Sequence, residues 1–238
     1  MKVGTDAILW ASFVAEFIDY SINNSDYIII PKPSNILDVG SGCGILSLCM
    51  AQVFEKALVT AIDIDKPSIE EAAKNFQSSQ FVERMQAKLI SLQDFAQTIS
   101  KYPFCNNIHY DLIISNPPFF TSSFLSPDIR RTNARHNNTL PLQDFVLSCK
   151  KIMSKKSHIC VILPMEESEK LKALFANENV LPLQIINVYP KPAAKVKRQV
   201  IIYTNYLGVK PIQKDFFIRD DSNMYTQQYK ELVSLFLL

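Results

Sequence analysis

The sequence predicts an α/β domain built on a doubly wound, mostly parallel sheet. Short apolar runs, typical of strands buried on both faces, alternate along the chain with amphipathic helical patterns. A glycine-rich segment directly follows the first of these strands, over residues 40–44. The chain has 238 residues, of which 47% are hydrophobic and 20% charged. This is enough for one large core, so we expect a single domain over residues 1–238.

The alternation begins after an N-terminal helix. Thr5 or Asp6 can cap this helix, which runs to about Tyr20, and residues 1–20 are therefore interpreted as a helix or lid segment. Its apolar stripe consists of Ile8, Leu9, Phe13 and Phe17. The elements expected next are strand 35–39, helix 45–53, strand 58–64, helix 67–75, strand 87–92, a loose stretch over 94–110, strand 112–115, helix 141–153 and strand 158–163.

Two further apolar runs break the alternation near the C-terminus. They cover 184–188 and 199–204, and the polar linker between them, 189–198, is too short for a crossover helix. We therefore expect an antiparallel hairpin at the end of the sheet.

The cysteines and the hydropathy pattern indicate the cellular compartment. Five cysteines, an odd number without a C-x-x-C pair, lie mostly in apolar stretches. They are typical of buried thiols in a reducing compartment, so we expect neither disulfides nor a metal site. Without a signal-like start or a run of about 20 apolar residues, the protein is expected to be cytoplasmic and not membrane-bound. The sequence leaves the oligomeric state open, with a monomer favoured.

Charge is distributed unevenly along the chain, although the net charge is only +2. Residues 1–119 hold 8 Lys and Arg against 13 Asp and Glu, a net −5, whereas residues 120–238 hold 17 against 10, a net +7. This asymmetry favours a polyanionic partner for the second half. The alternative is that these lysines and arginines are ordinary solvated surface charges.

Acidic residues stand at the ends of three predicted strands. The motif D-V-G-S-G-C-G at 38–44 lets a ligand approach the backbone, although the glycines alone would equally suit a dinucleotide. Asp63 ends the next strand and fits a carboxylate that accepts two ribose hydroxyls, with Asp65 as the competing candidate. Asp94 is placed to accept from an adenine amino group, with Phe95 at the rim of the ring pocket. Each acid could instead cap the following helix.

The tetrad N-P-P-F at 116–119 closes the fourth apolar strand. Two consecutive prolines donate no backbone N–H and stiffen the chain, so the carbonyl oxygens of this turn remain free to accept external hydrogen bonds. The amide side chain adds another acceptor, and the aromatic ring can lie on a base. Such a turn can hold a planar amino group, although it could also be an ordinary turn after a buried strand.

From residue 35 to 120 the chain resembles the class I methyltransferases that use S-adenosylmethionine. The resemblance implies a Rossmann-like, seven-stranded sheet with a C-terminal antiparallel hairpin. It also implies a set of site residues. The methionine part of the cofactor would be held by Asp38, Gly40, Gly42 and Gly44, the ribose by Asp63, and the adenine by Asp94 and Phe95. The target amine would be held by Asn116, Pro117, Pro118 and Phe119, with Asn116 also beside the cofactor.

Two more motifs narrow the resemblance. With N-P-P-F, the opening K-V-G-T-D at 2–6 and R-R-T-N-A-R-H at 130–136 resemble the bacterial tRNA adenine-N6 methyltransferases that modify position 37 of a valine tRNA. Relatives usually carry a further segment ahead of the first motif. The resemblance implies that Lys2, Gly4, Thr5 and Asp6 help to close the cofactor pocket. The RNA contacts that it implies are Arg130, Arg131, Arg135, Lys195, Lys197 and Arg198.

Other functions remain open at this point. Similar tetrads occur in enzymes that methylate guanine N2 in ribosomal RNA, and an N-P-P-Y version in those that methylate a glutamine amide of a release factor. The latter bring a helical N-terminal domain that this sequence does not show. A module that binds cofactor and RNA without catalysis, or a nicotinamide-dependent oxidoreductase, would use the same glycine loop, but the oxidoreductase gives the tetrad no role.

Overall fold

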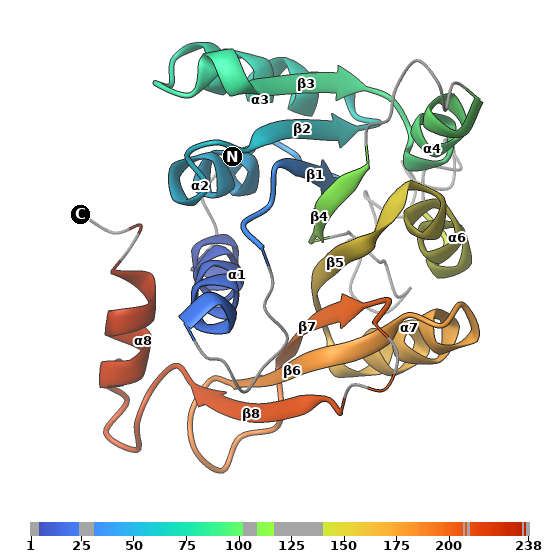
Figure 1. Cartoon of the computed structure of the whole chain (residues 1–238). Helices are drawn as coiled ribbons and strands as arrows, with labels where there is room; N and C mark the ends of the chain where they lie inside the picture. The colour runs from blue at the N-terminus through green and yellow to red at the C-terminus, as the bar shows by residue number, and fades with distance from the viewer. Residues whose placement is uncertain are drawn as a thin grey trace, which may run out of the picture.

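A twisted sheet of eight strands forms the centre of the molecule, with helices on both faces (Figure 1). The strand order is β3-β2-β1-β4-β5-β7-β6-β8, which confirms the predicted doubly wound α/β class. The elements are α1 (Thr5–Asn23), β1 (Asn35–Val39), α2 (Ile45–Val53), β2 (Leu58–Asp63), α3 (Lys66–Gln77), a 3₁₀ turn (Val82–Arg84), β3 (Met85–Leu89), α4 (Leu92–Lys101), β4 (Tyr110–Ser115), α6 (Leu142–Ile152), β5 (Met153–Leu163), α7 (Met165–Asn177), β6 (Leu181–Tyr189), β7 (Arg198–Thr204), β8 (Ile212–Phe217) and α8 (Gln227–Val233).

This computed structural model describes residues 5–23, 31–101, 109–116, 140–206, 208, 210–234 and 236. For residues 5, 6, 19–23, 155 and 156 it describes the backbone alone.

The order of strands places β1 near the middle of the parallel part of the sheet. β1 pairs in parallel with β2 on one side and β4 on the other, and β4 pairs in parallel with β5. β1 and β4 are buried along nearly their whole length, as expected for strands covered on both faces. The predicted antiparallel pairing of the C-terminal hairpin is confirmed, because β7 pairs antiparallel with both β5 and β6.

The edge of the sheet differs from the prediction. β8 pairs in parallel with β6 and makes the sheet eight-stranded rather than seven-stranded, so the hairpin does not lie at its end. Lys214 and Asp215 are exposed and only Phe216 is buried in this strand. The apolar alternation that would have indicated a strand is therefore missing, as is common for edge strands.

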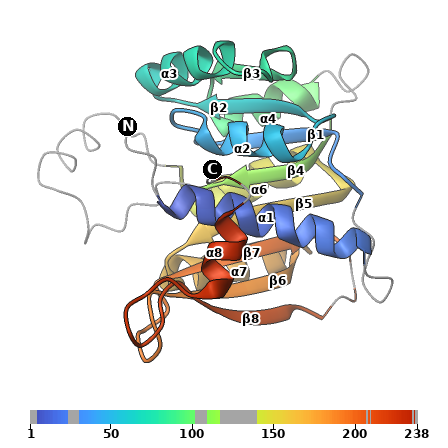
Figure 2. The same cartoon turned by 90° about the vertical axis from the view of Figure 1, so that its left-hand side faces the viewer.

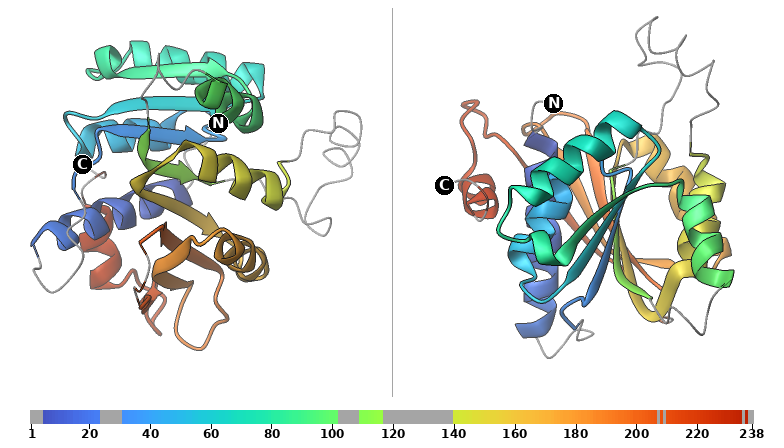
Figure 3. Two further views of the ribbon diagram at one scale, coloured as in Figure 1. Left: turned by 45° about the vertical axis from the view of Figure 1, so that its right-hand side comes forward. Right: turned by 90° about the horizontal axis from the view of Figure 1, so that it is seen from above.

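The helices form one layer on each face of the sheet. α1, α2 and α3 cover one face, with α8 outside α1, and α4, α6 and α7 cover the other (Figures 1 and 3). The two largest clusters of buried apolar side chains fill the two spaces between sheet and helices. Four cysteines are buried free thiols, at positions 43, 49, 149 and 160.

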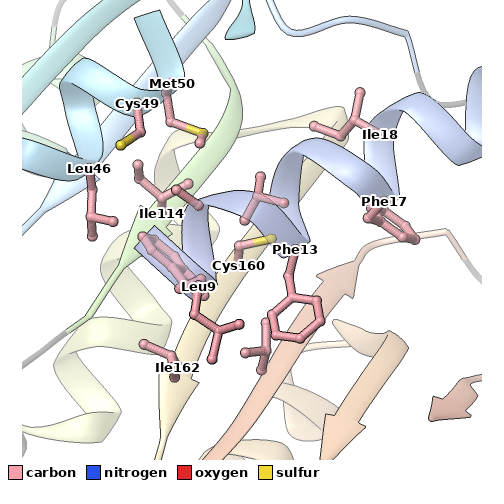
Figure 4. Packing of buried hydrophobic residues seen from close by; sticks show 14 of the residues in the cluster. Leu9, Phe13, Phe17, Ile18, Leu46, Cys49, Met50, Ile114, Cys160 and Ile162 are labelled. Atoms are coloured by element: carbon pink, nitrogen blue, oxygen red, sulfur yellow. The ribbon is translucent and has the colours of Figure 1, made fainter. Parts of the chain in front are cut away.

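The predicted N-terminal helix is confirmed, and it is more deeply buried than an amphipathic helix. Trp10 is completely buried, and Leu9 and Phe13 point into the cluster formed with α2 and the sheet (Figure 4). Phe13 also makes an edge-to-face contact with Phe216 of β8, with ring centroids 4.8 Å apart. Because the sheet, α2 and α8 surround it, the described part of the 1–20 segment is a core helix. Residues 1–4 lie outside the described part.

The sequence prediction was wrong between residues 85 and 101. The strand expected at 87–92 is β3, Met85–Leu89, and the loose stretch expected after Asp94 begins as helix α4. The hydroxyl of Ser91 accepts the amide N–H of Asp94 at 3.1 Å, which caps the helix and ends the strand early. Leu92, Phe95 and Ala96 are buried at helical spacing.

No helix in the described ranges is long and apolar enough to cross a membrane.

Candidate active site

Several of the predicted site residues that the structure describes lie where the parallel strands end. Val39, the last residue of β1, pairs with Ile62 of β2 and with Ser115 of β4. The residues that follow these strands, among them Gly40 and Asn116, therefore emerge side by side at the carboxyl edge of the sheet. This edge, at which the glycine loop connects β1 to α2 (Figure 2), is where open α/β sheets bind ligands.

The glycine loop has the backbone geometry that the motif predicted. Gly40, Gly42 and Gly44 have φ angles of 68°, 55° and 79°, in the left-handed region that favours glycine. The amides of Gly40 and Ser41 donate to the carbonyl of Ile62 at 2.9 and 3.1 Å, which fixes the loop to the end of β2.

Gly44 also allows α3 to pack against the end of this loop. A Cβ atom at this position would lie 2.5 Å from the ring of Phe76, much closer than atoms can approach. Phe76 is buried, and its position in α3 is what closes the space.

Asp63 ties the loop to the second strand. Its Oδ2 accepts the amide of Gly42 and its Oδ1 accepts the amide of Asp65, both at 2.9 Å. The competing Asp65 caps α3 instead, because its Oδ2 accepts the amide of Ser68 at 3.0 Å and the hydroxyl of Ser68 at 2.6 Å. Asp65 is thus engaged as a helix cap, and the ribose-binding role of Asp63 stays a prediction.

Asp38 is a fully buried carboxylate at the base of the loop. Its Oδ2 accepts the hydroxyl of Ser47 at 2.7 Å, and its Oδ1 has no hydrogen-bond partner within the described part of the chain. Burial raises the pKa of Asp38 from 3.8 to about 7; hydrogen bonds from Ser47 oppose this shift and the charge of Asp63 adds to it. An unpaired buried carboxylate oxygen fits a cationic ligand group, such as an amino acid's ammonium. Ser47, one of two polar residues in the apolar helix α2, was not predicted.

The adenine-side residues occupy different environments. Asp94 is exposed in the first turn of α4, where its Oδ2 accepts the hydroxyl of Ser91 at 2.7 Å. Phe95 is 5% exposed and packs against Tyr110, with ring centroids 5.9 Å apart. The ammonium of Lys88 lies 5.6 Å from the centroid of the Phe95 ring. Phe95 therefore belongs to the core beneath this edge, and its contact with cofactor stays a prediction.

Asn116 is exposed directly after β4. The hydroxyl of the preceding Ser115, which is buried, donates to the carbonyl of Val39 at 2.8 Å and holds the ends of β4 and β1 together. Thr5 and Asp6 form the start of α1. The remaining predicted positions lie outside the described residues: Lys2, Gly4, Pro117, Pro118, Phe119, Arg130, Arg131 and Arg135.

The three basic residues predicted near the hairpin are described. Lys195 and Lys197 are exposed and Arg198 is half-buried. They lie at the carboxyl end of β6, which runs parallel to β8 and, through β7, has the same direction as β5 and β4. The basic linker is thus on the same edge of the sheet as Asn116.

A cavity of about 710 Å³ lies elsewhere, between α1, the end of α2, β8 and α8. None of the predicted site residues lines it. The described residues contain no cluster of His, Cys, Asp or Glu that could hold a metal ion.

The sequence and the fold have counterparts among known proteins. A family model described as the methyltransferase small domain matches residues 27–135. Among solved structures, a predicted O-methyltransferase from Agrobacterium tumefaciens superposes with a TM-score of 0.70 at 16% identity, covering 96% of this chain and 95% of that chain. A ribosomal protein L11 methylase from Lactobacillus delbrueckii superposes with a TM-score of 0.52 at 14% identity, covering 85% and 80%. The matched family model, together with this fold, identifies the class of protein as an S-adenosylmethionine-dependent methyltransferase.

Relatives with higher sequence identity are more specific. A tRNA1(Val) (adenine(37)-N6)-methyltransferase from Parabacteroides distasonis is 32% identical over 241 residues, covering 100% of this chain and 91% of the relative. The enzyme of the same name from Flavobacterium johnsoniae is 30% identical, covering 100% and 93%. The chain belongs to the tRNA1(Val) (adenine(37)-N6)-methyltransferase family, which confirms the resemblance seen in the sequence motifs.

Proposed function

We propose that this protein transfers a methyl group from S-adenosylmethionine to the exocyclic N6 of adenine 37 in a valine tRNA. Family membership supports the substrate. The observation that carries the proposal for the site is the pairing of Val39 with Ser115, because the amide of Asn116 then follows β4 beside the start of the glycine loop. A target amine held by Asn116 would be next to a ligand held by the loop.

Residues of the loop and the strand ends would hold the cofactor. The free Oδ1 of Asp38 suits the ammonium of its methionine part, and the left-handed glycines leave the backbone of the loop open to it. Asp63 would accept the ribose hydroxyls and Asp94 the adenine amino group. Lys2, Gly4, Thr5 and Asp6 would close the pocket. When bound, S-adenosylmethionine supplies an electrophilic methyl group on sulfur.

The chain's contribution to the reaction is to position the amine. Adenine N6 is a poor nucleophile because its lone pair is delocalised into the ring. Accepting its two hydrogens on the Asn116 side-chain oxygen and the Pro117 carbonyl would favour the pyramidal nitrogen that attacks a methyl group. Phe119 would stack on the base once it has left its neighbours, which costs least in a loop such as the anticodon arm.

Positive side chains would bind the RNA backbone. Guanidinium groups pair bidentately with phosphate oxygens, which is the role proposed for Arg130, Arg131 and Arg135. Lys195, Lys197 and Arg198 would provide a second set of phosphate contacts. A tRNA substrate is consistent with a cytoplasmic protein that acts as a monomer.

The test is incubation of the protein with S-adenosylmethionine and a valine tRNA transcript, followed by nucleoside mass spectrometry. We expect N6-methyladenosine, and none with a transcript that carries guanine at position 37. Methylguanosine in ribosomal RNA would instead support a guanine-N2 methyltransferase. Binding of cofactor and tRNA without any methyl transfer would indicate a non-catalytic binding module.

A further inference from the structure

Two loops at the carboxyl edge of the sheet are joined into one surface. Residues 190–198 connect β6 to β7, and residues 218–226 connect β8 to α8; together we call them the edge-loop surface. The amide of Ile218 donates to the carbonyl of Tyr189 at 3.0 Å, and the amide of Arg219 donates to the carbonyl of Pro190 at 3.1 Å. The two loops project side by side at the lower left of Figure 2.

The second loop is a folded turn rather than an open connection. Arg219 and Tyr225 form a β-bridge, and Oδ1 of Asp220 accepts the amide of Met224 at 3.0 Å. Nη1 of Arg219 donates to the carbonyl of Asn223 at 2.7 Å. A turn held by this many local bonds presents its side chains in a fixed arrangement.

Two side chains of this turn, Met224 and Tyr225, are exposed to solvent, whereas Tyr229 of α8 is buried. The rings of Tyr225 and Tyr229 are stacked with centroids 4.7 Å apart, and the Arg219 guanidinium lies 4.1 Å from the Tyr225 centroid. Arg219 is half-buried at the end of this column. Met224, adjacent in the turn, is 62% exposed. A column of this kind, with an apolar neighbour, is suited to stacking an unpaired base.

The first loop supplies unpaired positive charge. Residues 190–198 contain four cations and no acid, whereas residues 218–226 contain one arginine and two aspartates, so the surface has a net charge of +3. Within the described ranges none of the four cations pairs with a carboxylate. These cations are Lys191, Lys195, Lys197 and Arg198.

The surface lies within reach of a substrate held at Asn116. β6 and β8 are the third and fourth strands from β4 in the sheet order. With about 4.8 Å between neighbouring strands, the two loops begin roughly 14 and 19 Å from the end of β4 along the same edge. An RNA arm that places one base at Asn116 would extend over this distance.

We propose that the edge-loop surface binds the RNA beside its target nucleotide: Lys191, Lys195, Lys197 and Arg198 contact backbone phosphates, and an unpaired neighbouring base stacks on Arg219 and Met224. This inference rests on the proposed function for its substrate, and it adds to that function a second RNA-binding element, the 218–226 turn. The positive loop explains attraction to a polyanion, and the stacked turn explains a preference for unpaired over fully paired RNA.

The test is the affinity of the full-length protein, in the Asn116→Ala background to prevent turnover, for a fluorescent hairpin of the valine tRNA anticodon arm. Lys195→Glu with Lys197→Glu should weaken binding on the order of 30-fold or more. The same pair should reduce the slope of log K against log salt by about 1.4, the loss of two single-strand phosphate contacts. Arg219→Lys keeps the positive charge but removes the planar guanidinium group on which a base could stack. This variant and Met224→Glu should each weaken binding about 10-fold.

The matched control is Lys210→Glu, an exposed cation just before β8 and therefore at the opposite edge, which should change affinity less than twofold. Thermal melts within about 2 °C of the parent protein would exclude misfolding of the variants. A fully paired RNA of equal length should bind more weakly than the hairpin. The Arg219→Lys substitution should change the affinity for this paired RNA only slightly.

The outcomes separate this inference from the proposed function. If the parent protein methylates adenine 37 and the same edge-loop substitutions, made with Asn116 intact, leave its KM for tRNA unchanged, the surface has no role and the function stands. If no tRNA is methylated but the variants bind the hairpin with the expected losses of affinity, the RNA-binding surface is supported and the proposed reaction is wrong. Variants that lose binding to anionic vesicles but not to the hairpin would overturn the assignment to RNA.

Discussion

The backbone amide of Gly42 donates a hydrogen bond of 2.9 Å to Oδ2 of Asp63, so the carboxylate predicted to bind ribose also holds the glycine loop in place. The other oxygen of the same carboxylate accepts the amide of Asp65. Asp63 therefore connects the turn after β1 to the turn after β2. The position of a ligand bound to this carboxylate would therefore be fixed relative to the backbone of the glycine loop, without any further contact.

This double contact separates the expected effects of Asp63→Ala and Asp65→Ala. Asp63→Ala should weaken S-adenosylmethionine binding by at least about 10-fold, because two hydroxyls lose a charged acceptor and the loop loses its anchor. Asp65→Ala removes the cap of α3 and should cost about 1 kcal/mol of unfolding free energy with cofactor affinity changed less than about threefold. Titration calorimetry and urea denaturation measure the two quantities. The reverse pattern would transfer the ribose role to Asp65.

Asn116 should affect catalysis rather than cofactor binding. Asn116→Ala removes one of the two acceptors proposed for the target amine, and we expect kcat to fall on the order of 100-fold or more, a few kcal/mol of transition-state stabilisation. Cofactor affinity should stay within about twofold. Asn116→Asp keeps an acceptor oxygen and should retain a larger share of the activity. Single-turnover methylation of the tRNA measures this step, and full activity of the alanine variant would remove Asn116 from the mechanism.

Asp38 should make both cofactor affinity and stability depend on pH. Its pKa of about 7 means that much of the carboxyl is protonated at pH 6, and a protonated carboxyl attracts an ammonium only weakly. S-adenosylmethionine affinity should therefore rise about fivefold from pH 6 to pH 7 and level off above this range, as for one group titrating near 7. Calorimetry at several pH values below 7.5 tests this, and Asp38→Asn should bind weakly with little dependence on pH.

The stability of the cofactor-free protein should change in the opposite direction. Because the folded pKa of Asp38 lies above its ordinary value of 3.8, the folded state binds more protons than the unfolded state between about pH 4 and 7. The contribution of Asp38 to stability is thus complete below pH 4 and is lost as pH rises through 7. Relative to Asp38→Asn, the parent protein should lose up to about 1.4 kcal/mol of unfolding free energy per pH unit in this window. A constant difference between the two proteins would contradict the buried, unpaired carboxyl.

The central strands could be predicted because burial on both faces makes them continuous apolar runs, as in Leu112–Ile114. Elements with one polar face were harder to predict. β8 exposes Lys214 and Asp215, and its identity as a strand comes from pairing with β6, a contact distant in sequence. α4 is hard to recognise in the sequence because the apolar residues before its cap, Ser91, continue the pattern of the preceding strand.

The candidate site residues could be predicted from the sequence where a single residue at the end of a strand carries the chemistry. Asp38, Asp63 and the glycines follow from the order of strand, loop and helix. Their partners do not, because Ser47 reaches Asp38 from inside α2 and Phe76 reaches Gly44 from α3. Such contacts depend on how helices rotate against the sheet, which short sequence patterns leave undetermined.

Gly44 provides a direct test of that packing. Gly44→Ala should destabilise the protein by two penalties: a left-handed φ of 79°, which costs roughly 1 kcal/mol for a residue with a Cβ, and a clash at 2.5 Å with the Phe76 ring. Gly208→Ala is the matched control, because Gly208 has a φ of 82° but nothing within 4 Å of the added Cβ. In urea denaturation we expect a loss of about 1 kcal/mol at Gly208 and of roughly 3 kcal/mol or more at Gly44. Combining Gly44→Ala with Phe76→Leu should recover part of the difference, since the smaller side chain vacates the space. Equal losses at the two glycines would mean that α3 does not press on the loop.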